Sequence, residues 1–192
     1  KARQRGIPQS EILAEWKDLN DRANFIGTSM HNYIENFFKK EYQTIPTDLD
    51  VVDRINKFNL IYAKHLYKLE PIKFEQRIFS KKYRIAGMID SIFMYNDSIL
   101  LLDWKSNKAF ETDDTEKGRY EKLLEPFSGL YKNHMNEYSI QLSIYMLILK
   151  EYGINIKQSY LMHIGPTQEP NIYRCLNLVD LLEEYLVNNP IL

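Results

Sequence analysis

The sequence predicts an α/β domain, a mixed β-sheet with helices on its faces, from three observations. Apolar residues recur at helical spacing through most of the first 70 residues. Three strand-like segments then follow one another, and the rest of the chain alternates between helical and strand patterns. Because 192 residues with a 44% hydrophobic content suit one packed unit, we expect a single domain.

Residues 1–70 are expected to be the helical N-terminal part of this domain. We expect Ser10 to cap a first helix, because its side chain can accept a hydrogen bond from the backbone of the first turn. The helical pattern continues over about residues 19–42. A second helix is predicted over about residues 49–69, and Pro71 ends it.

Residues 71–176 are expected to be the sheet core, and residues 177–192 to hold a last helix. Strands are predicted over residues 72–79, 83–95, 99–105, 154–164 and 172–176. A helix over about residues 137–152 separates the third strand from the fourth. We expect Asn96-Asp97 to be the tight turn of a hairpin between the second and third strands.

The chain has one cysteine, Cys175, which excludes an internal disulfide, a four-cysteine zinc site and an iron–sulfur cluster. This favours an intracellular location, cytoplasmic or in the nucleoid, with Cys175 as a small buried residue at a strand end. No apolar run approaches the roughly 18 to 20 residues that span a membrane. Because the first residue is Lys rather than Met, an organelle-targeting segment ahead of it stays an open alternative.

The net charge of −1 argues mildly against a nucleic-acid-binding protein, since such proteins often carry a large basic excess. The charge is unevenly spread, however. Residues 64–84 hold seven lysines and arginines against two glutamates. A basic run of this kind is most often a solvated face, so it permits binding to nucleic acid without indicating it.

The third predicted strand, residues 99–105, is apolar until it reaches Asp103 and Lys105. Side chains two residues apart on a strand share a face, about 6.6 Å apart along the strand, so these two point the same way. A buried carboxylate and ammonium are costly unless they are paired or used in chemistry. Taken alone, the pattern is consistent with a structural ion pair as well as with a catalytic pair.

Asp90 lies in the preceding strand, within an otherwise apolar stretch. Asp90 and Asp103 each lie six residues from the predicted turn, so an ideal hairpin places them directly opposite each other. Two carboxylates that close repel unless a cation lies between them, and oxygen ligands select Mg²⁺ or Mn²⁺ over zinc. With Lys105 on the same face, this set suits metal-assisted hydrolysis of a phosphodiester bond.

Two pairs of residues on predicted helices add to this set. His31 and Glu35 are four residues apart and share a helix face, with Gly27 one turn earlier. A glycine inside a helix costs about 1 kcal/mol relative to alanine, which suits a place where another backbone or a ligand approaches closely. Gln141 and Tyr145 are a second same-face pair. Taken singly, His31 is more simply a surface or core histidine, and the second pair the polar edge of an amphipathic helix.

Together these residues resemble the PD-(D/E)XK nuclease superfamily, and within it the RecB-like exonuclease branch. This branch includes the nuclease domains of bacterial recombination helicases and the mitochondrial genome maintenance exonuclease. Its motifs occur in the order Gly-x-x-x-His, Glu, Gly-x-x-Asp, Asp-x-Lys and Gln-x-x-x-Tyr. In this sequence they stand, in order, at Gly27 to His31, Glu75, Gly87 to Asp90, Asp103 to Lys105, and Gln141 to Tyr145. The match spans about residues 19–152 and implies a restriction-endonuclease-like fold, with a mixed β-sheet core flanked by α-helices.

The resemblance also implies a role for each matched residue. The expected metal ligands are His31, Asp90, Asp103 and the backbone carbonyl of Trp104. Lys105, with Asp90 and Asp103, is expected to be catalytic. Contacts with DNA are expected from Gln141, Tyr145, Gly27 and Ser106. Glu35 and Glu75 are expected around the metal ligands, and Glu75 either supports them or binds a second ion.

Two departures from the branch narrow the comparison. Many relatives carry four cysteines for an iron–sulfur cluster, which this chain cannot form, and some exonucleases have Glu-x-Lys where this chain has Asp-Trp-Lys. Residues 106–136, an inserted segment of unusual length for a compact domain, are expected to lie beside the active site and cover a DNA strand. The aromatic residues expected there to stack on bases are Phe110, Tyr120, Phe127 and Tyr131.

The resemblance thus implies a Mg²⁺- or Mn²⁺-dependent deoxyribonuclease with one or two ions, an exonuclease that acts on single strands or free ends in replication, recombination or repair. Its expected partners are DNA and other replication or recombination proteins, with no membrane. Three alternatives stay open. They are a structure-specific endonuclease on the same fold, a catalytically silent nucleic-acid-binding module, and an RNA nuclease.

Overall fold

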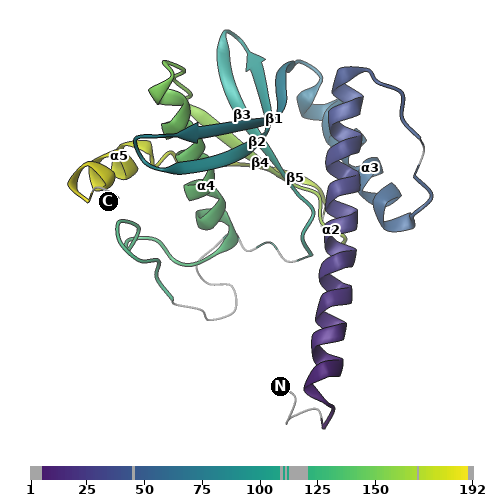
Figure 1. Cartoon of the computed structure of the whole chain (residues 1–192). Helices are drawn as coiled ribbons and strands as arrows, with labels where there is room; N and C mark the ends of the chain where they lie inside the picture. Colours follow the sequence, from purple (N-terminus) through teal and green to yellow (C-terminus); the bar gives the residue numbers. More distant parts are fainter. Residues whose placement is uncertain are drawn as a thin grey trace.

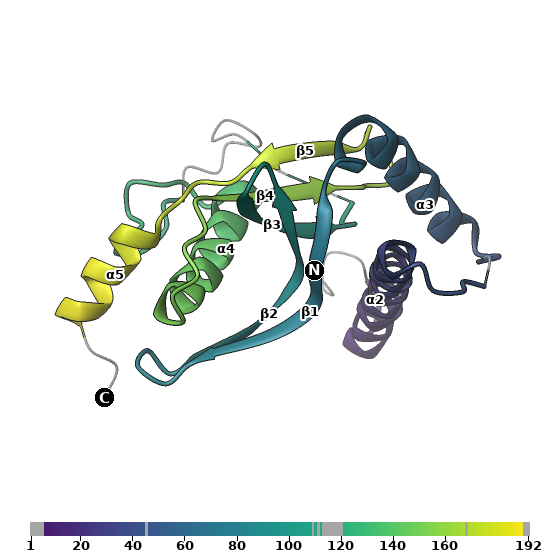
Figure 2. The same ribbon diagram turned by 90° about the horizontal axis from the view of Figure 1, so that it is seen from above.

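The protein is a five-stranded mixed sheet with helices on both faces, as Figures 1 and 2 show. The computed structural model describes residues 6–44, 46–108, 110, 112, 121–167 and 169–189. The helices are α2 (Gln9–Lys39), α3 (Leu49–Ile61), the π-helical turn η1 (Tyr62–Leu66), α4 (His134–Glu151) and α5 (Val179–Asn188). The strands are β1 (Glu70–Ser80), β2 (Ile85–Tyr95), β3 (Ser98–Lys105), β4 (Gln158–His163) and β5 (Asn171–Arg174). The predicted fold class is confirmed.

The sheet has the order β1-β2-β3-β4-β5, and only the pair β3–β4 is parallel. A parallel pair needs a long crossover, which here runs through the segment after β3 and helix α4. The pairs β1–β2, β2–β3 and β4–β5 are antiparallel. The β2–β3 hairpin turns at Asn96 and Asp97, which both have positive φ values, 46° and 58°. Positive φ at both central residues defines the turn whose twist matches that of the flanking strands, so the predicted turn is confirmed.

Alternating residues of the central strands feed two separate apolar cores. On one face, Leu101 belongs to a core closed by α4 and α5. On the other face, Leu102 and Trp104 belong to a core closed by α2 and α3. Figure 2 shows the two helix pairs on opposite sides of the sheet. The sheet is therefore buried on both faces, which makes β3 a central strand.

The core under α2 and α3 is largely aromatic, and Phe58 lies at its centre with no exposed surface. Its ring centroid lies between 5.3 and 6.2 Å from those of five other rings. These belong to Tyr33, Phe37, Phe38, Tyr62 and Trp104. Because Trp104 lies between Asp103 and Lys105 in β3, this core ties the end of β3 to α2 and α3.

The helices begin at residues other than the predicted cap Ser10. The prediction of Ser10 as a cap was wrong, because α2 begins at Gln9 and Pro8 occupies the capping position without a side-chain hydrogen bond. Proline has the φ angle of a helix and no N–H to satisfy, so it starts a helix without a polar cap. Asp48 caps α3 and Asn133 caps α4, each accepting hydrogen bonds from backbone N–H groups of the first turn.

Two predicted segments are shorter than expected. The strand predicted over residues 154–164 begins only at Gln158, because α4 ends at Glu151 and a connection follows, in which Gly153 has a φ of +78°. Ile156 in that connection is buried in the core. An apolar residue at this position therefore resembles a buried strand residue when only the sequence is known. The helix predicted over residues 49–69 changes at Tyr62 into the π-helical turn η1.

Cys175 directly follows β5 and is 7% exposed, as predicted for a small buried residue at a strand end. Burial raises the pKa of its thiol to about 11, so the reactive thiolate is rare at neutral pH. Within the described part of the chain, no helix combines the length and the apolar character needed to cross a membrane.

Replacing Phe58 by Ala should lower the free energy of unfolding by about 3–5 kcal/mol, because it removes the ring at the centre of the aromatic core. Leu60→Ala is the matched control on the same helix. Leu60 is 54% exposed, so this change should cost less than about 0.5 kcal/mol. Urea denaturation followed by circular dichroism measures both. Equal losses would show that Phe58 is not a central packing residue.

Candidate active site

A cavity of about 860 Å³ opens between α2, α3 and the end of β3. Its wall includes His31 from α2, Glu75 from β1 and Lys105 from β3, together with the residues that directly follow β3. Gly27 and Ser106 also line it. The cavity therefore gathers predicted site residues that are far apart in the sequence.

Three adjacent strands bring three carboxylates together beside this cavity, and of the three Glu75 lines it. The register of β2 with β3 pairs Ser91 with Leu102, so its next step sets Asp90 beside Asp103, as the turn predicted. The register of β1 with β2 likewise brackets Glu75 and Asp90 as neighbours. Two hairpins in succession are enough to assemble an acidic row across the sheet.

Glu75 has a φ of +47°, in the left-handed region that side-chain-bearing residues rarely adopt. Such a conformation costs on the order of 1–3 kcal/mol and persists where the surrounding structure enforces it, often at functional sites. The carboxylate of Glu75 lies 3.8 Å from His31 Nδ1. The distorted backbone therefore belongs to a residue that takes part in the polar group around His31.

His31, Glu75 and Asp90 offer one nitrogen and two oxygen atoms that all lie within 4.8 Å of one another. His31 Nδ1 lies 3.7 Å from Asp90 Oδ2. On the other side of the ring, Nε2 makes a 3.1 Å hydrogen bond to the carbonyl oxygen of Trp104. A carbonyl only accepts, so Nε2 carries the proton, and in a neutral imidazole Nδ1 keeps its lone pair toward the carboxylates.

This donor set fits a divalent cation. Two carboxylates converge on one imidazole nitrogen, and each ligand comes from a different element of the fold, α2, β1 or β2. Asp90 is held in place because its Oδ2 accepts a 3.0 Å hydrogen bond from the backbone N–H of Trp104. Oxygen-rich sets of this kind suit Mg²⁺ or Mn²⁺, and the imidazole nitrogen extends the range to softer metals.

Asp103 is 2% exposed and turns toward Lys105, with 2.6 Å between Oδ2 and the lysine Nζ. Burial raises the pKa of Asp103, and the neighbouring Asp90 carboxylate adds to the rise, while Lys105 opposes it. For Lys105, burial lowers the pKa, but the attraction of Asp103 outweighs it and the net direction is upward. The two side chains share a face as predicted, and their ion pair lies at the end of the acidic row that Asp103 belongs to.

Tyr138 is a site residue that the sequence did not reveal. It lies in the first turns of α4, and Lys105 Nζ lies 4.7 Å from the centre of its ring, a distance at which a cation is attracted to an aromatic face. Tyr138 also lines the cavity. Its position three residues before Gln141 puts both on one helix face, which was the one available signal.

Gln141 and Tyr145 are joined by a 2.8 Å hydrogen bond from the amide Nε2 to the tyrosine hydroxyl. Tyr145 is only 8% exposed, so of the two Gln141 is the better placed to reach a ligand. The ring of Tyr145 packs on the backbone of Gly87. A Cβ at Gly87 would lie 2.4 Å from Tyr145 Cε1, which leaves room for glycine alone.

Other predicted residues lie in different surroundings. A Cβ at Gly27 would meet Ser106 Oγ at 3.4 Å, an ordinary contact, so close packing is not what requires glycine there. Glu35 is paired with Lys39 at 2.5 Å and stands outside the group formed by His31, Glu75 and Asp90.

The aromatic residues of the inserted segment divide into three cases. Phe110 is 4% exposed and stacks on His163 with 4.6 Å between ring centres, so the expectation that it stacks on bases was wrong. Its ring fills an apolar core instead. Tyr120 lies outside the described residues. Phe127 and Tyr131 are half-buried, and their stacking on bases stays a prediction.

No protein-family model matches the chain. Over 77 residues, 38% of its length, the chain is 32% identical to an ATP-dependent helicase/nuclease subunit from Streptococcus pyogenes serotype M5 (strain Manfredo), and equally to its counterpart from serotype M49 (strain NZ131). The chain spans about 6% of the length of these curated relatives. A solved structure from Eubacterium rectale, of a protein provisionally named an exonuclease, has a TM-score of 0.52 at 12% identity, over 88% of this chain and 65% of the other.

The predicted resemblance to RecB-like nucleases is confirmed. The solved structure shares the fold, and the relatives that match in sequence carry a nuclease in their name.

Asp90→Asn should weaken binding of Mn²⁺ at least tenfold, because it removes one of two carboxylates from the group around His31. Asp97→Asn, the same change at the exposed turn of the β2–β3 hairpin, should leave binding unchanged. Isothermal titration calorimetry with Mn²⁺ measures both. Equal affinities in the two variants would place the metal elsewhere.

Gly87→Ala should lower the free energy of unfolding by about 1–3 kcal/mol, because the added methyl group displaces the ring of Tyr145. The loss should shrink in a Tyr145→Ala background, where the obstacle is gone. Gly129→Ala is the control, since a Cβ there meets nothing within 4 Å. Thermal denaturation of the wild type, the two single variants at Gly87 and Tyr145, and their double variant gives the coupling energy between the two residues. Additive losses would mean that the two residues do not constrain each other.

Proposed function

We propose that the chain is a Mg²⁺- or Mn²⁺-dependent deoxyribonuclease that degrades DNA as an exonuclease, from single strands or free ends. One observation carries the proposal. His31, Glu75 and Asp90 form a group of potential metal ligands beside the ion pair of Asp103 and Lys105, and His31, Glu75 and Lys105 line one cavity. Hydrolysis of a phosphodiester needs both parts, a place for a divalent cation and a donor for the charge that develops on the phosphate.

His31, Glu75 and Asp90 would hold the cation, with Asp103 and the carbonyl of Trp104 beside them. A divalent cation bound there polarises the phosphate and lowers the pKa of an attacking water. The other parts of the mechanism belong to groups of the protein itself, both backbone and side chain. The Trp104 carbonyl fixes the orientation of the His31 ring, and the Trp104 N–H fixes Asp90. These contacts arrange the ligands before any ion or substrate arrives, which reduces the reorganisation needed for catalysis.

Lys105 has the second task. Its ammonium is a hydrogen-bond donor at the wall of the cavity, and its side chain is 20% exposed, so a substrate phosphate can reach it. In the absence of substrate it is held between the Asp103 carboxylate and the face of Tyr138. We assign Lys105 to orienting the attacking water or stabilising negative charge on the phosphate, with Tyr138 limiting the positions that the ammonium can take.

Cleavage from ends is supported by the provisional name of the structural neighbour, and DNA metabolism by the helicase/nuclease subunits that match in sequence. We therefore place the protein in replication, recombination or repair inside the cell, with other proteins of those processes as partners. A structure-specific endonuclease, an RNA nuclease and a catalytically silent binding module are the competing functions, and substrate choice separates them.

End-labelled linear single-stranded DNA should be degraded with Mg²⁺ or Mn²⁺ and not with EDTA. Lys105→Ala should reduce the rate by roughly 10²- to 10³-fold, the usual effect of removing one donor to a developing charge. Lys157→Ala, an exposed lysine outside the cavity, is the control and should keep full activity. Lys105→Ala with full activity, or degradation in EDTA, would contradict the proposal.

Covalently closed circular single-stranded DNA and an RNA of the same sequence complete the experiment. An exonuclease leaves the circle intact, whereas an endonuclease opens it. Degradation of the RNA at the rate of the DNA would move the assignment to a nuclease without sugar selectivity. Binding without cleavage in any metal would favour the silent module.

A further inference from the structure

Arg54 lies in the middle of α3 and lines the same cavity as the candidate metal ligands, although it is only 4% exposed. Arginine is almost never buried unless its charge is paired. A buried arginine on the wall of this cavity therefore requires a partner for its charge. Its hydrogen bonds show which of its donors already have an acceptor.

The guanidinium group of Arg54 has five N–H donors, each of which needs an acceptor when the group is buried. Nη1 donates to the carboxylate of Asp53, the preceding residue. Nε is fully buried and finds no acceptor among the residues that the structure describes. Leaving a buried charged donor without an acceptor is strongly unfavourable, so a ligand whose oxygen atoms accept hydrogen bonds from the part of the guanidinium group at the cavity would offset some of this cost.

The local charge balance also favours an anion. Asp53 is shared, because Lys57 Nζ lies 3.0 Å from the same carboxylate oxygen that Arg54 contacts. The ammonium of Lys57 is fixed further by two 2.9 Å hydrogen bonds, to the carbonyl oxygens of Gly165 and Pro166. One carboxylate thus faces two cations, and Lys57 has its other acceptors in the backbone. The single carboxylate of Asp53 therefore balances one of the two positive charges that Arg54 and Lys57 carry.

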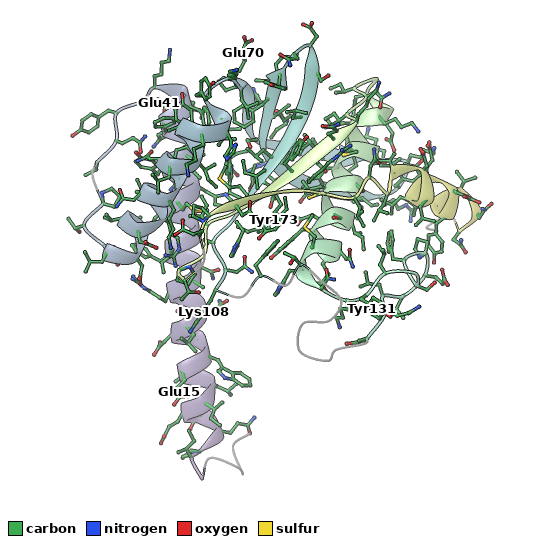
Figure 3. The ribbon with its side chains drawn as sticks, turned by 180° about the vertical axis from the view of Figure 1, so that it is seen from behind. Glu15, Glu41, Glu70, Lys108, Tyr131 and Tyr173 are labelled. Atoms are coloured by element: carbon green, nitrogen blue, oxygen red, sulfur yellow. The ribbon has the colours of Figure 1, made fainter. Side chains whose placement is uncertain are left out.

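The rest of the cavity wall does not neutralise this charge. Asp50 lines the cavity, but its carboxylate accepts a hydrogen bond from Arg22. Lys108, which Figure 3 shows beside α2, adds a further cation to the same wall. Arg54 and Lys108 thus both bring positive charge to this cavity, while the acidic row lies with His31.

We infer that Arg54 binds a phosphate group of the nucleic-acid strand, apart from the phosphate that is hydrolysed. The inference rests on the proposed function in one respect, the nucleic acid as ligand. A guanidinium fork matches two phosphate oxygens at once and is the preferred side chain for this contact. Arg54 lines the cavity from α3, and His31 and Glu75 line it from α2 and β1, so a strand bound at both places spans the cavity. This anchor fixes how far the strand advances toward the metal ligands.

The test measures binding of fluorescein-labelled oligonucleotides by anisotropy in EDTA, where no cleavage occurs, over a range of salt concentrations. Each phosphate contact on a single strand contributes about 0.7 to the slope of log K against log salt. Arg54→Met should lower that slope by about 0.7 and weaken binding on the order of tenfold, the loss expected for a charged hydrogen bond. Arg174→Met, an exposed arginine outside the cavity, should change neither quantity.

Arg54→Lys covers the case in which Arg54→Met does not fold, which a thermal melt reveals. Lysine keeps the charge and loses the planar fork, so the slope should stay and the affinity should fall several-fold. Comparing oligonucleotides with and without a 5′-phosphate, and with and without a 3′-phosphate, separates the two sources of the ligand. If removing a terminal phosphate abolishes the difference between wild type and variant, Arg54 holds a strand end. If the difference persists, it holds an internal phosphodiester.

An unchanged slope and affinity in the folded variants would overturn the inference. The outcome is distinct from that of the nuclease experiment, because binding in EDTA needs no metal and no cleavage. Metal-dependent degradation combined with an unchanged slope would contradict the phosphate-binding role of Arg54 and support the nuclease proposal. A lowered slope without degradation in any metal would support the phosphate-binding role of Arg54 and indicate a nucleic-acid-binding module instead of a nuclease.

Discussion

The antiparallel pairing of β2 with β3 is the constraint on which the rest of the site depends. Its register sets Asp90 beside Asp103, and the pairing of β1 with β2 adds Glu75 to the row. Side chains alternate between faces along a strand, so a slip by one residue would send a carboxylate into the opposite, apolar core. The two-residue turn at the hairpin end prevents the slip, since its positive φ angles close the strands at one register only.

Bringing several acidic groups together on neighbouring strands of a buried sheet opposes folding. The protein offsets that cost with contacts from several directions. Lys105 pairs with Asp103, the backbone N–H of Trp104 donates to Asp90, and the imidazole of His31 faces the remaining carboxylates. The aromatic core beneath Trp104 gives these contacts a rigid base. The polar group and the apolar core are therefore parts of one arrangement, because the same short segment of β3 contributes to both.

Much of this arrangement was readable in the sequence, because it depends on local periodicity. The hairpin register followed from counting residues to the turn, and the shared face of Asp103 and Lys105 from the alternation along a strand. The fold class followed from the order of the patterns. Whether Asp103, Lys105, Gln141 and the other assigned residues perform their expected roles stays a prediction.

The features that escaped sequence reasoning depend on distant contacts. Tyr138 and Arg54 matter only because α4 and α3 turn those particular faces toward the cavity, which no local spacing encodes. Phe110 was misjudged for the same reason, since a polar surrounding sequence concealed an aromatic residue that fills a core. The backbone distortion at Glu75 is likewise enforced by its neighbours rather than by its own preference.

The parallel pairing of β3 with β4 has a consequence for how such a protein can diversify. The chain leaves the sheet at Lys105 and returns through α4, and both ends of this excursion are fastened, one by the pairing of Lys105 with His163 and the other by the cap at Asn133. Lengthening a loop between fixed ends costs little, about 0.6 kcal/mol for each doubling. The connection between these fixed ends can thus be lengthened at little cost while the row of Glu75, Asp90 and Asp103 keeps its geometry.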